Sequence, residues 1–170
     1  DDLDPFGVAQ VLAASLARIE HDLIWLGWKG VDHDHGIVGA ALAELLDLPH
    51  VSFVVGVEIA EDGKSGRMEK EVEGAHEVVE TSLPAVLTAQ KGLNEPRYPS
   101  LKGIMAVKNK PITVWGAEEL GLDVQRLAPR LEFVSASLPP QRKGGMLIEG
   151  SSQEQARELV RLLREEAKVI

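Results

Sequence analysis

The sequence predicts an α/β protein built on a doubly wound, mostly parallel sheet with a small antiparallel meander. Two observations lead to this prediction. First, a helical pattern near the start is followed by a short apolar run, a polar loop and a second helical pattern, which is half of a doubly wound unit. Second, residues 67–82 alternate with period two, as antiparallel strands do. The length of 170 residues fits a single domain, residues 1–170, with a sizeable core.

The first helix is expected over residues 1–20. Asp4 is placed to cap it and Pro5 suits its first helical position. Its predicted buried stripe consists of Val8, Val11, Leu12, Leu16 and Ile19. Leu23–Gly27 is a continuous apolar run ended by glycine, which predicts a parallel strand buried on both faces. A polar loop over residues 28–36 then leads to a helix at residues 39–46.

The rest of the chain is predicted mainly from β-branched runs and helix caps. Strands are expected at residues 51–60, 67–73, 77–82, 85–89, 112–115 and 131–137, and a helical turn at residues 118–122. Ser151, with Glu154 three residues later, predicts a capping box at the start of the last helix.

Composition excludes several classes of function. The formal net charge is −9, which argues against a nucleic-acid-binding surface. The absence of cysteine excludes a disulfide framework, a thiol nucleophile and a cysteine metal site. No apolar run approaches the length of about 20 residues that a membrane span needs, so the chain is not expected to be membrane-embedded.

A stiff, proline-bounded segment precedes a short apolar helix. Pro96 and Pro99 hold the backbone extended, so the side chains of Arg97 and Tyr98 are expected to project from the loop. Ser100 can cap the helix that follows. The apolar residues of that helix at helical spacing are Leu101, Ile104 and Met105. The residues alone favour an ordinary loop and core helix; a surface that docks on a partner is the alternative.

The loop of residues 27–39 lies between a predicted strand end and a helix start, where open α/β sheets bind ligands. Its glycines allow a close backbone approach, and the N–H groups of the next helix favour an anion. The run Asp32-His33-Asp34-His35 also suggests a zinc or manganese site, although neighbouring loop residues point apart. A solvated polar loop is the third interpretation.

Several segments resemble the beta subunit of electron-transfer flavoproteins, and together they cover the whole chain. The family signature L-N-E-P-R-Y-P-S-L matches residues 93–101, and its L-P-A-V-(V/L)-T-A strand matches residues 83–89. Residues 139–145 resemble P-P-x-R-x-A-G, with Gly144 in place of alanine, and residues 166–170 resemble the family's ending. The resemblance implies an adenine-nucleotide-binding type of fold whose first strands precede Asp1 and are missing from this chain.

The resemblance also implies an AMP site. The family carries G-K-Q-A-I-D-D-D-x-N-Q-T-G at residues 27–39, and that loop binds AMP. The residues it assigns to AMP here are Gly27, Lys29, Gly30, Val31, Asp32, Asp34, Gly36, Ile37, Val38 and Gly39. Gly36, Ile37 and Val38 replace three polar residues, so the backbone contacts to a phosphate are retained and the side-chain contacts are lost.

A flavin-facing acid follows from the same comparison. Residues 70–74, K-E-V-E-G, resemble the family's R-E-(V/I)-D-G-G, in which the glutamate matched by Glu71 lies near the FAD ring. A carboxylate at that place influences the reduction potential of the flavin. Without the resemblance, Glu71 belongs to a solvated strand of alternating charge.

The implied function is electron transfer without a catalytic residue or substrate turnover of its own. An alpha subunit holds most of the FAD, flavin dehydrogenases of the acyl-CoA dehydrogenase type supply electrons, and a membrane quinone reductase receives them. The resemblance assigns docking on the dehydrogenase to Arg97, Tyr98, Pro99, Ser100, Leu101, Ile104 and Met105. It implies a bacterial, cytoplasmic protein that takes part in fatty acid oxidation. The alternatives are a bifurcating subunit with a second FAD, and an ATP-using or nucleotide-sensing α/β protein.

Overall fold

The computed structural model describes residues 3–132, 134–141 and 144–170. The chain divides into two compact units, residues 1–132 and residues 133–170, and each is described by itself. The single domain expected over residues 1–170 stays a prediction.

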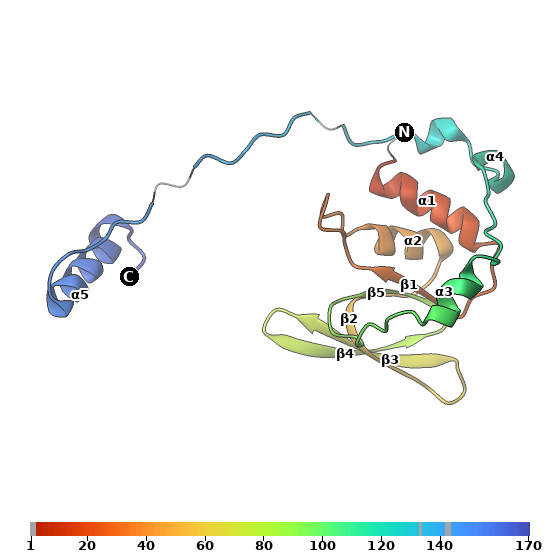
Figure 1. Cartoon of the computed structure of the whole chain (residues 1–170), viewed down its shortest axis with the longest axis horizontal. Helices are drawn as coiled ribbons and strands as arrows, with labels where there is room; N and C mark the ends of the chain where they lie inside the picture. The colour runs from red at the N-terminus through yellow and green to blue at the C-terminus, as the bar shows by residue number, and fades with distance from the viewer. Residues whose placement is uncertain (1–2, 133, 142–143) are drawn as a thin grey trace. The chain divides into compact units, whose positions relative to one another are not determined.

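The first unit is built on one five-stranded sheet with the strand order β1-β5-β2-β3-β4. The strands are β1 Leu23–Gly27, β2 His50–Ile59, β3 Ser65–Val72, β4 Ala75–Ser82 and β5 Ala85–Ala89. β1, β5 and β2 are mutually parallel, whereas β3 and β4 add an antiparallel meander (Figure 1). The predicted α/β class and the meander are therefore confirmed.

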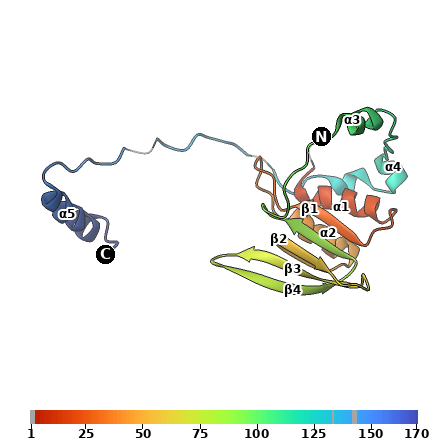
Figure 2. The same cartoon turned by 60° about the horizontal axis from the view of Figure 1, so that its bottom comes forward.

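Two helices cover one face of the parallel strands: α1, Pro5–Leu16, and α2, Val38–Leu46 (Figure 2). Both predicted features of the start of α1 are present: the Asp4 side chain accepts from the N–H of Gly7 at 2.7 Å, and Pro5 is the first residue of the helix. The buried cluster on this face contains Ala9, Ile24, Leu42, Ala43 and Val86. α2 ends at Asp47, whose φ of 54° lies in the left-handed region.

A second buried cluster joins the parallel strands to the meander. The register of β2 against β5 shifts between Val51 and Val54, and Phe53 within this bulge has a φ of 59°. Bulges bend a strand and increase its twist. Side chains of β3 therefore pack with those of β5, in a buried cluster of Val51, Val54, Met68, Ala85 and Leu87.

Two expectations for the start of the chain are wrong. β1 is not buried on both faces: only Ile24 is buried, and Trp25 is 42% exposed because β1 lies at the edge of the sheet. The stripe of α1 also differs, since the helix ends at Leu16 before Ile19 is reached. Val8 and Val11 do not belong to the buried cluster on this face, whereas Leu12 and Leu16 pack against it. Strands ahead of Asp1 stay a prediction; among the described residues, the outer edge of β1 carries no strand.

Two predicted strands are also wrong. Residues 112–115 form no strand, and neither do residues 131–132 and 134–137; residue 133 lies outside the described residues. β-Branched composition suggested both, but a strand needs a neighbour to hydrogen-bond, and these runs pair with none of the described strands. The predicted helical turn exists as α4, Ala117–Leu120, followed by the 3-10 helix η1, Val124–Leu127.

A buried carboxylate ties the end of the first unit to its start. Asp4 is 8% exposed, and its second oxygen accepts from the N–H of Arg130 at 2.7 Å. The Arg130 guanidinium lies 4.5 Å from the centre of the Phe6 ring. These backbone N–H donors, Gly7 first and then Arg130, hold the pKa of Asp4 below its usual value.

The second unit contains α5, Ser152–Arg161, and the π-helix η2, Leu162–Glu166. The predicted capping box is confirmed: the N–H and hydroxyl of Ser151 both donate to Glu154, at 2.8 and 2.6 Å. Neither helix contains a buried residue within this unit. Among the described residues of the chain, no helix is long and apolar enough to cross a membrane.

Candidate functional site: the loop between β1 and α2

Residues 27–39 run from the end of β1 to the start of α2, as the sequence predicted. The N–H of Trp28 donates to the carbonyl of Ala89 at 3.2 Å, so the loop leaves the sheet beside the end of β5. The parallel strands β1 and β5 both end here. The loop thus lies at the carboxyl edge of the sheet, where this fold class binds ligands.

The loop is braced by its own residues. Lys29 Nζ lies 2.5 Å from Asp34 Oδ1, and the N–H of Asp34 donates to the carbonyl of Gly30 at 3.2 Å. Asp34 has a φ of 59°, in the left-handed region that aspartate tolerates better than most residues. Lys29, the one lysine of a loop without arginine, is therefore already paired with a carboxylate.

The first turn of α2 offers backbone donors. Ile37 is the N-cap residue and makes no side-chain capping hydrogen bond. The first N–H groups of a helix have no partner within the helix and favour an anion. This geometry fits the backbone-only contacts expected for a phosphate, because Ile37 and Val38 have no polar side-chain atoms.

Gly39 has a second role that the sequence did not reveal. A Cβ at this position would collide with Thr88 Cγ2 of β5, and it would lie 3.3 Å from His50 Nε2. Glycine is thus required for α2 to approach the sheet. The Thr88 hydroxyl and His50 Nε2 are buried without a hydrogen-bond partner in the structure. Burial first, and then the nearby Lys70 charge, lowers the pKa of His50.

The run from Asp32 to His35 does not gather into a metal site. The rings of His33 and His35 stack with their centres 5.5 Å apart. Asp32 lies 3.4 Å from His33 Nδ1, and hydrogen bonds, first from the backbone N–H of His33, lower the Asp32 pKa. Across the described part of the chain, no group of three or more histidine, aspartate or glutamate side chains is placed to hold a metal ion.

Trp28 is a residue of the loop that sequence reasoning left out. Its ring packs against Phe53, with the ring centres 4.6 Å apart and the planes tilted by 59°. Lys29 Nζ lies 4.3 Å from the Trp28 ring centre. The signal was present in the sequence, since Trp28 directly follows the glycine that ends the predicted strand.

Glu71 lies on β3, close to the level at which β1 ends. Gly27 of β1 pairs with Ala89 of β5. Ala89 pairs with Val54 of β2, which in turn pairs with Lys70 of β3. Three strand spacings therefore separate Lys70, next to Glu71, from the end of β1, at most about 15 Å. Glu71 thus lies three strands away from the end of β1, and no hydrogen bond or ion pair among the described residues joins it to the loop.

The Glu71 carboxylate is exposed at the end of the β3–β4 hairpin. It faces His76 across the hairpin, but His76 Nδ1 instead lies 2.5 Å from Glu69 Oε1. Lys70 pairs with Glu77 at 3.4 Å. The two residues before Glu71 on β3, Glu69 and Lys70, thus have charged partners, and Glu71 makes no ion pair with another described residue. A free carboxylate fits the role of facing a bound cofactor.

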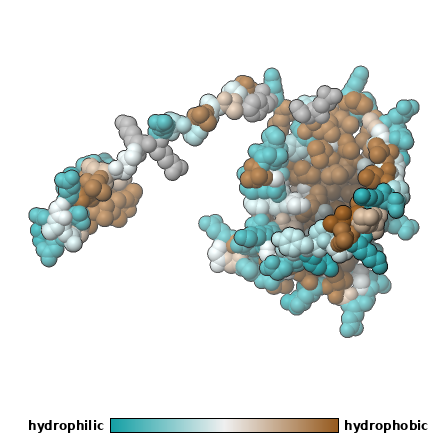
Figure 3. Space-filling model, in the orientation of Figure 1, coloured by the Kyte–Doolittle hydropathy of each residue, from teal (hydrophilic) through white to brown (hydrophobic). Residues whose placement is uncertain are grey.

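The proline-bounded segment leads into α3, Leu101–Val107. Ser100 caps it as predicted, accepting from the N–H of Gly103 at 3.1 Å. No residue of α3 is buried, and Leu101 is 77% exposed. Figure 3 shows the hydrophobic surface that α3 presents. The core-helix interpretation therefore finds no packing partner among the described residues.

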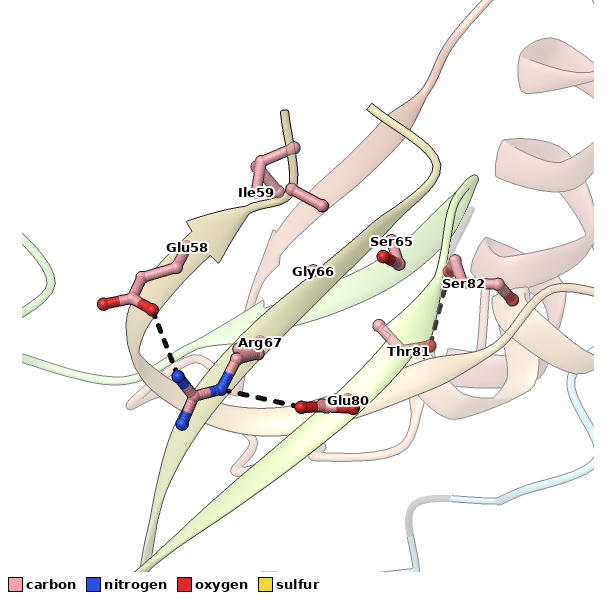
Figure 4. A pocket seen from close by; sticks show the side chains of 9 residues that line it. Glu58, Ile59, Ser65, Gly66, Arg67, Glu80, Thr81 and Ser82 are labelled. Atoms are coloured by element: carbon pink, nitrogen blue, oxygen red, sulfur yellow. Dashed lines mark hydrogen bonds and ion pairs between the residues drawn. The ribbon is translucent and has the colours of Figure 1, made fainter. Parts of the chain in front are cut away.

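A pocket of about 530 Å³ lies elsewhere, over β2, β3 and β4 (Figure 4). Arg67 extends between Glu58 and Glu80, at 3.6 and 3.7 Å. This pairing of Arg67 with Glu80 could have been predicted from the sequence, because the two residues lie equally far before and after the Glu73-Gly74 turn. Two carboxylates against one guanidinium give a net negative charge, which does not suit a phosphate, and none of the predicted site residues lines this pocket.

Comparison with known proteins shows the family to which the chain is similar. Residues 1–120 match the family model described as the electron transfer flavoprotein domain. The chain is 44% identical over 170 residues to the electron transfer flavoprotein subunit beta of Bacillus subtilis, covering all of this chain and 65% of that protein. It is 38% identical over 149 residues to the mouse subunit beta, covering 88% of this chain and 56% of that protein.

A third relative carries a different name. The chain is 35% identical over 168 residues to the caffeyl-CoA reductase-Etf complex subunit CarD of Acetobacterium woodii, which covers 95% of this chain and 63% of that protein. The chain thus spans between 56% and 65% of the length of these three relatives.

Proposed function

Because this chain belongs to the electron transfer flavoprotein family, as a beta subunit, we propose that it forms half of a heterodimeric electron carrier. In this proposal electrons pass from flavin dehydrogenases of the acyl-CoA dehydrogenase type, through FAD shared with an alpha subunit, to a membrane quinone reductase. The observation that carries the proposal is the 44% identity to a named beta subunit along the whole chain. Bacterial cytoplasm and fatty acid oxidation are parts of the same proposal.

The second unit supports a partner subunit. α5 and η2 contain no buried residue within their unit, although they carry apolar side chains on one side. Leu159 and Val160 are 48% and 45% exposed. On the opposite side, Arg161 pairs with Glu158 and Glu165, which raise its pKa. A helix with one apolar and one charged side is stabilised by packing its apolar side against a partner, here the proposed alpha subunit.

The segment of residues 97–105 supports docking on a dehydrogenase. Tyr98 is 98% exposed, and the side chains of Leu101, Ile104 and Met105 are exposed beyond it. Rigid aromatic and aliphatic side chains of this kind act as anchors at protein interfaces. Arg97, Pro99 and Ser100 hold and frame this surface in the proposal.

For the flavin, we propose that Glu71 faces the FAD ring; bound FAD supplies the electron transfer itself. A carboxylate there opposes added negative charge, so Glu71→Ala raises the reduction potential of the flavin. Glu61→Ala, which removes an equal charge in the β2–β3 turn, is the matched control. Spectroelectrochemistry of the heterodimer measures the flavin reduction potential of both variants. An equal potential in the Glu71 variant and wild type would mean that Glu71 is an ordinary solvated strand residue that does not face the flavin.

For the nucleotide, we propose that the loop of residues 27–39 binds AMP through backbone N–H groups at the start of α2. The absence of a side-chain cap at Ile37 supports this, because it leaves those donors open to a ligand. The Gly36-Ile37-Val38 segment supplies no polar side-chain atom.

A second candidate is a subunit of a bifurcating carrier, in which a second FAD takes the place of AMP. The similarity to a subunit of a caffeyl-CoA reductase-Etf complex favours keeping this candidate. Counting flavins separates the two, since the first proposal gives one per heterodimer and the second gives two. The remaining alternative, an ATP-using or nucleotide-sensing protein, predicts ATP turnover or nucleotide binding without a flavin subunit.

The experiment that tests the main proposal is purification of the native complex followed by an absorption spectrum and mass spectrometry. The proposal predicts co-purification with a larger subunit and a flavin spectrum that bleaches when a dehydrogenase and its substrate are added. A protein that purifies alone and without flavin would contradict it.

A further inference from the structure

The indole N–H of Trp28 lies at the entrance of α2 with no acceptor. A Cβ built on Gly36 would lie 3.1 Å from Trp28 Nε1, so the indole edge faces the backbone two residues before the helix begins. Gly36 makes this approach possible because it has no side chain. Among the hydrogen bonds of the described residues, none uses the Trp28 Nε1–H as its donor.

The ring is held in this position from two sources. Phe53 packs against it at 4.6 Å, and Lys29 Nζ lies over it at 4.3 Å, within the range of a cation–π contact. Phe53 reaches the ring from a bulge with a positive φ of 59°. A bulky residue rarely adopts that backbone region, and such strain concentrates at functional sites.

Few other residues of the loop offer a free side-chain donor to a ligand. Ile37 and Val38 are apolar, Gly36 has no side chain, and the Lys29 ammonium is paired with Asp34 at 2.5 Å. Indole Nε1 is a donor only, so the group it can bind is an acceptor such as a phosphate oxygen. Trp28 thereby offers a side-chain N–H donor that has no carboxylate partner among the described residues. The other ring N–H groups of the loop belong to His33 and His35, whose rings stack on each other.

We propose that Trp28 Nε1–H is the side-chain donor to the phosphate of a nucleoside monophosphate bound by residues 27–39. Gly36 is the residue that permits the contact. This inference rests on the proposed nucleotide site and adds a specificity-determining residue to it. The N–H donates to a phosphate oxygen, alongside the backbone N–H groups at the start of α2.

The test is a calorimetric titration of the intact heterodimer with AMP and with adenosine. Trp28→Phe keeps a six-membered aromatic ring beside Phe53 and removes the five-membered ring with its N–H donor, so AMP binding weakens by about 10- to 100-fold while adenosine binding is unchanged. Trp25→Phe, the same exchange on β1, is the control and leaves both affinities within about twofold of wild type. Melting temperatures confirm that each variant is folded.

Gly36→Ala provides an independent test that leaves the indole in place. The added methyl contacts Nε1 and keeps the phosphate away from it, so AMP binding weakens in this variant as well. Equal AMP affinity in wild type and Trp28→Phe overturns the role of Trp28 and leaves the nucleotide site standing. Equal losses for AMP and adenosine overturn the phosphate contact. If wild type binds no AMP, the proposed nucleotide site itself fails, and the role of Trp28 with it.

Discussion

Helices α2 and α3 are similar in composition but differ in how far their side chains are buried. Both helices are short and mostly apolar. In α2, Leu42 is fully buried and Ala43 nearly so, whereas no residue of α3 is buried. Gly39 lets α2 lie against β5, and α3 instead begins after a stiff proline segment. Apolar spacing thus predicts a helix without saying whether its partner is the chain's own core or another protein.

The largest expected effect is on the core side of this comparison. Leu42→Ala should cost about 2–5 kcal/mol of unfolding free energy, because the side chain is fully buried in the cluster formed with residues of α1, β1 and β5. Leu45→Ala on the same helix is the control. Its side chain is 42% exposed, so it should lose less than about 1 kcal/mol. Chemical denaturation measures both, and similar losses in the two variants would remove the distinction between the two sides of α2.

A smaller effect is expected where α2 touches the sheet. Gly39→Val adds side-chain atoms that collide with Thr88, so we expect a loss of roughly 1–3 kcal/mol from overpacking. Combining it with Thr88→Ala should recover part of that loss, because the two positions are in contact. Denaturation of the single and double variants tests this, and strictly additive losses would show that the contact is not the cause.

The sequence predicted the regular elements of the first unit because each carries a local signal. Asp4 and Pro5 mark the start of α1, Ser100 marks that of α3, and the alternation along β3 and β4 marks the meander. The strands expected at residues 112–115 and 131–137 carry β-branched residues but depend on pairing with distant residues, which composition does not reveal. The exposure of Trp25 is likewise a property of β1's place at the sheet edge.

The position of the loop of residues 27–39 was predictable because a strand-loop-helix order fixes it at the carboxyl edge of the sheet. The contacts within it were not. The Trp28–Phe53 packing depends on a bulge in β2, about 25 residues later in the chain. The collision between a residue-39 side chain and Thr88 similarly depends on how closely α2 approaches β5.

A third effect concerns the link between Asp4 and Arg130, which stabilises the fold at neutral pH and weakens in acid. The folded state lowers the Asp4 pKa, so the ionised carboxylate stabilises the fold above its unfolded pKa of about 4, and this stability is lost as pH falls through the lower folded value. Asp4→Asn keeps one acceptor and places an amide donor opposite a backbone N–H. We expect this variant to have a lower melting temperature than wild type at neutral pH. We also expect its melting temperature to fall less than that of wild type as the pH is lowered.

The control for this prediction is Asp22→Asn, since Asp22 is exposed and makes no ion pair among the described residues. Melting temperatures measured from pH 7 down to acid should separate the two variants. An Asp4→Asn profile that parallels that of wild type at every pH would show that the Asp4 carboxylate does not stabilise the fold through its charge.

The smallest expected effect on stability belongs to α3. Leu101 is 77% exposed and contributes little buried surface within the described chain, so Leu101→Ala should change the unfolding free energy by less than about 0.5 kcal/mol. If Leu101 enters a dehydrogenase pocket, the same change removes about 1.5–3 kcal/mol of apolar burial from the complex. That corresponds to docking weakened by roughly 10- to 150-fold.

The most direct test of the account is therefore the rate at which a cognate dehydrogenase, at low concentration, reduces the flavin of the heterodimer carrying Leu101→Ala. We predict a rate lower by roughly 10- to 150-fold, in a protein whose melting temperature matches that of wild type. An unchanged rate accompanied by a lower melting temperature would contradict the account, because it would mean that Leu101 stabilises the fold and does not contact the dehydrogenase.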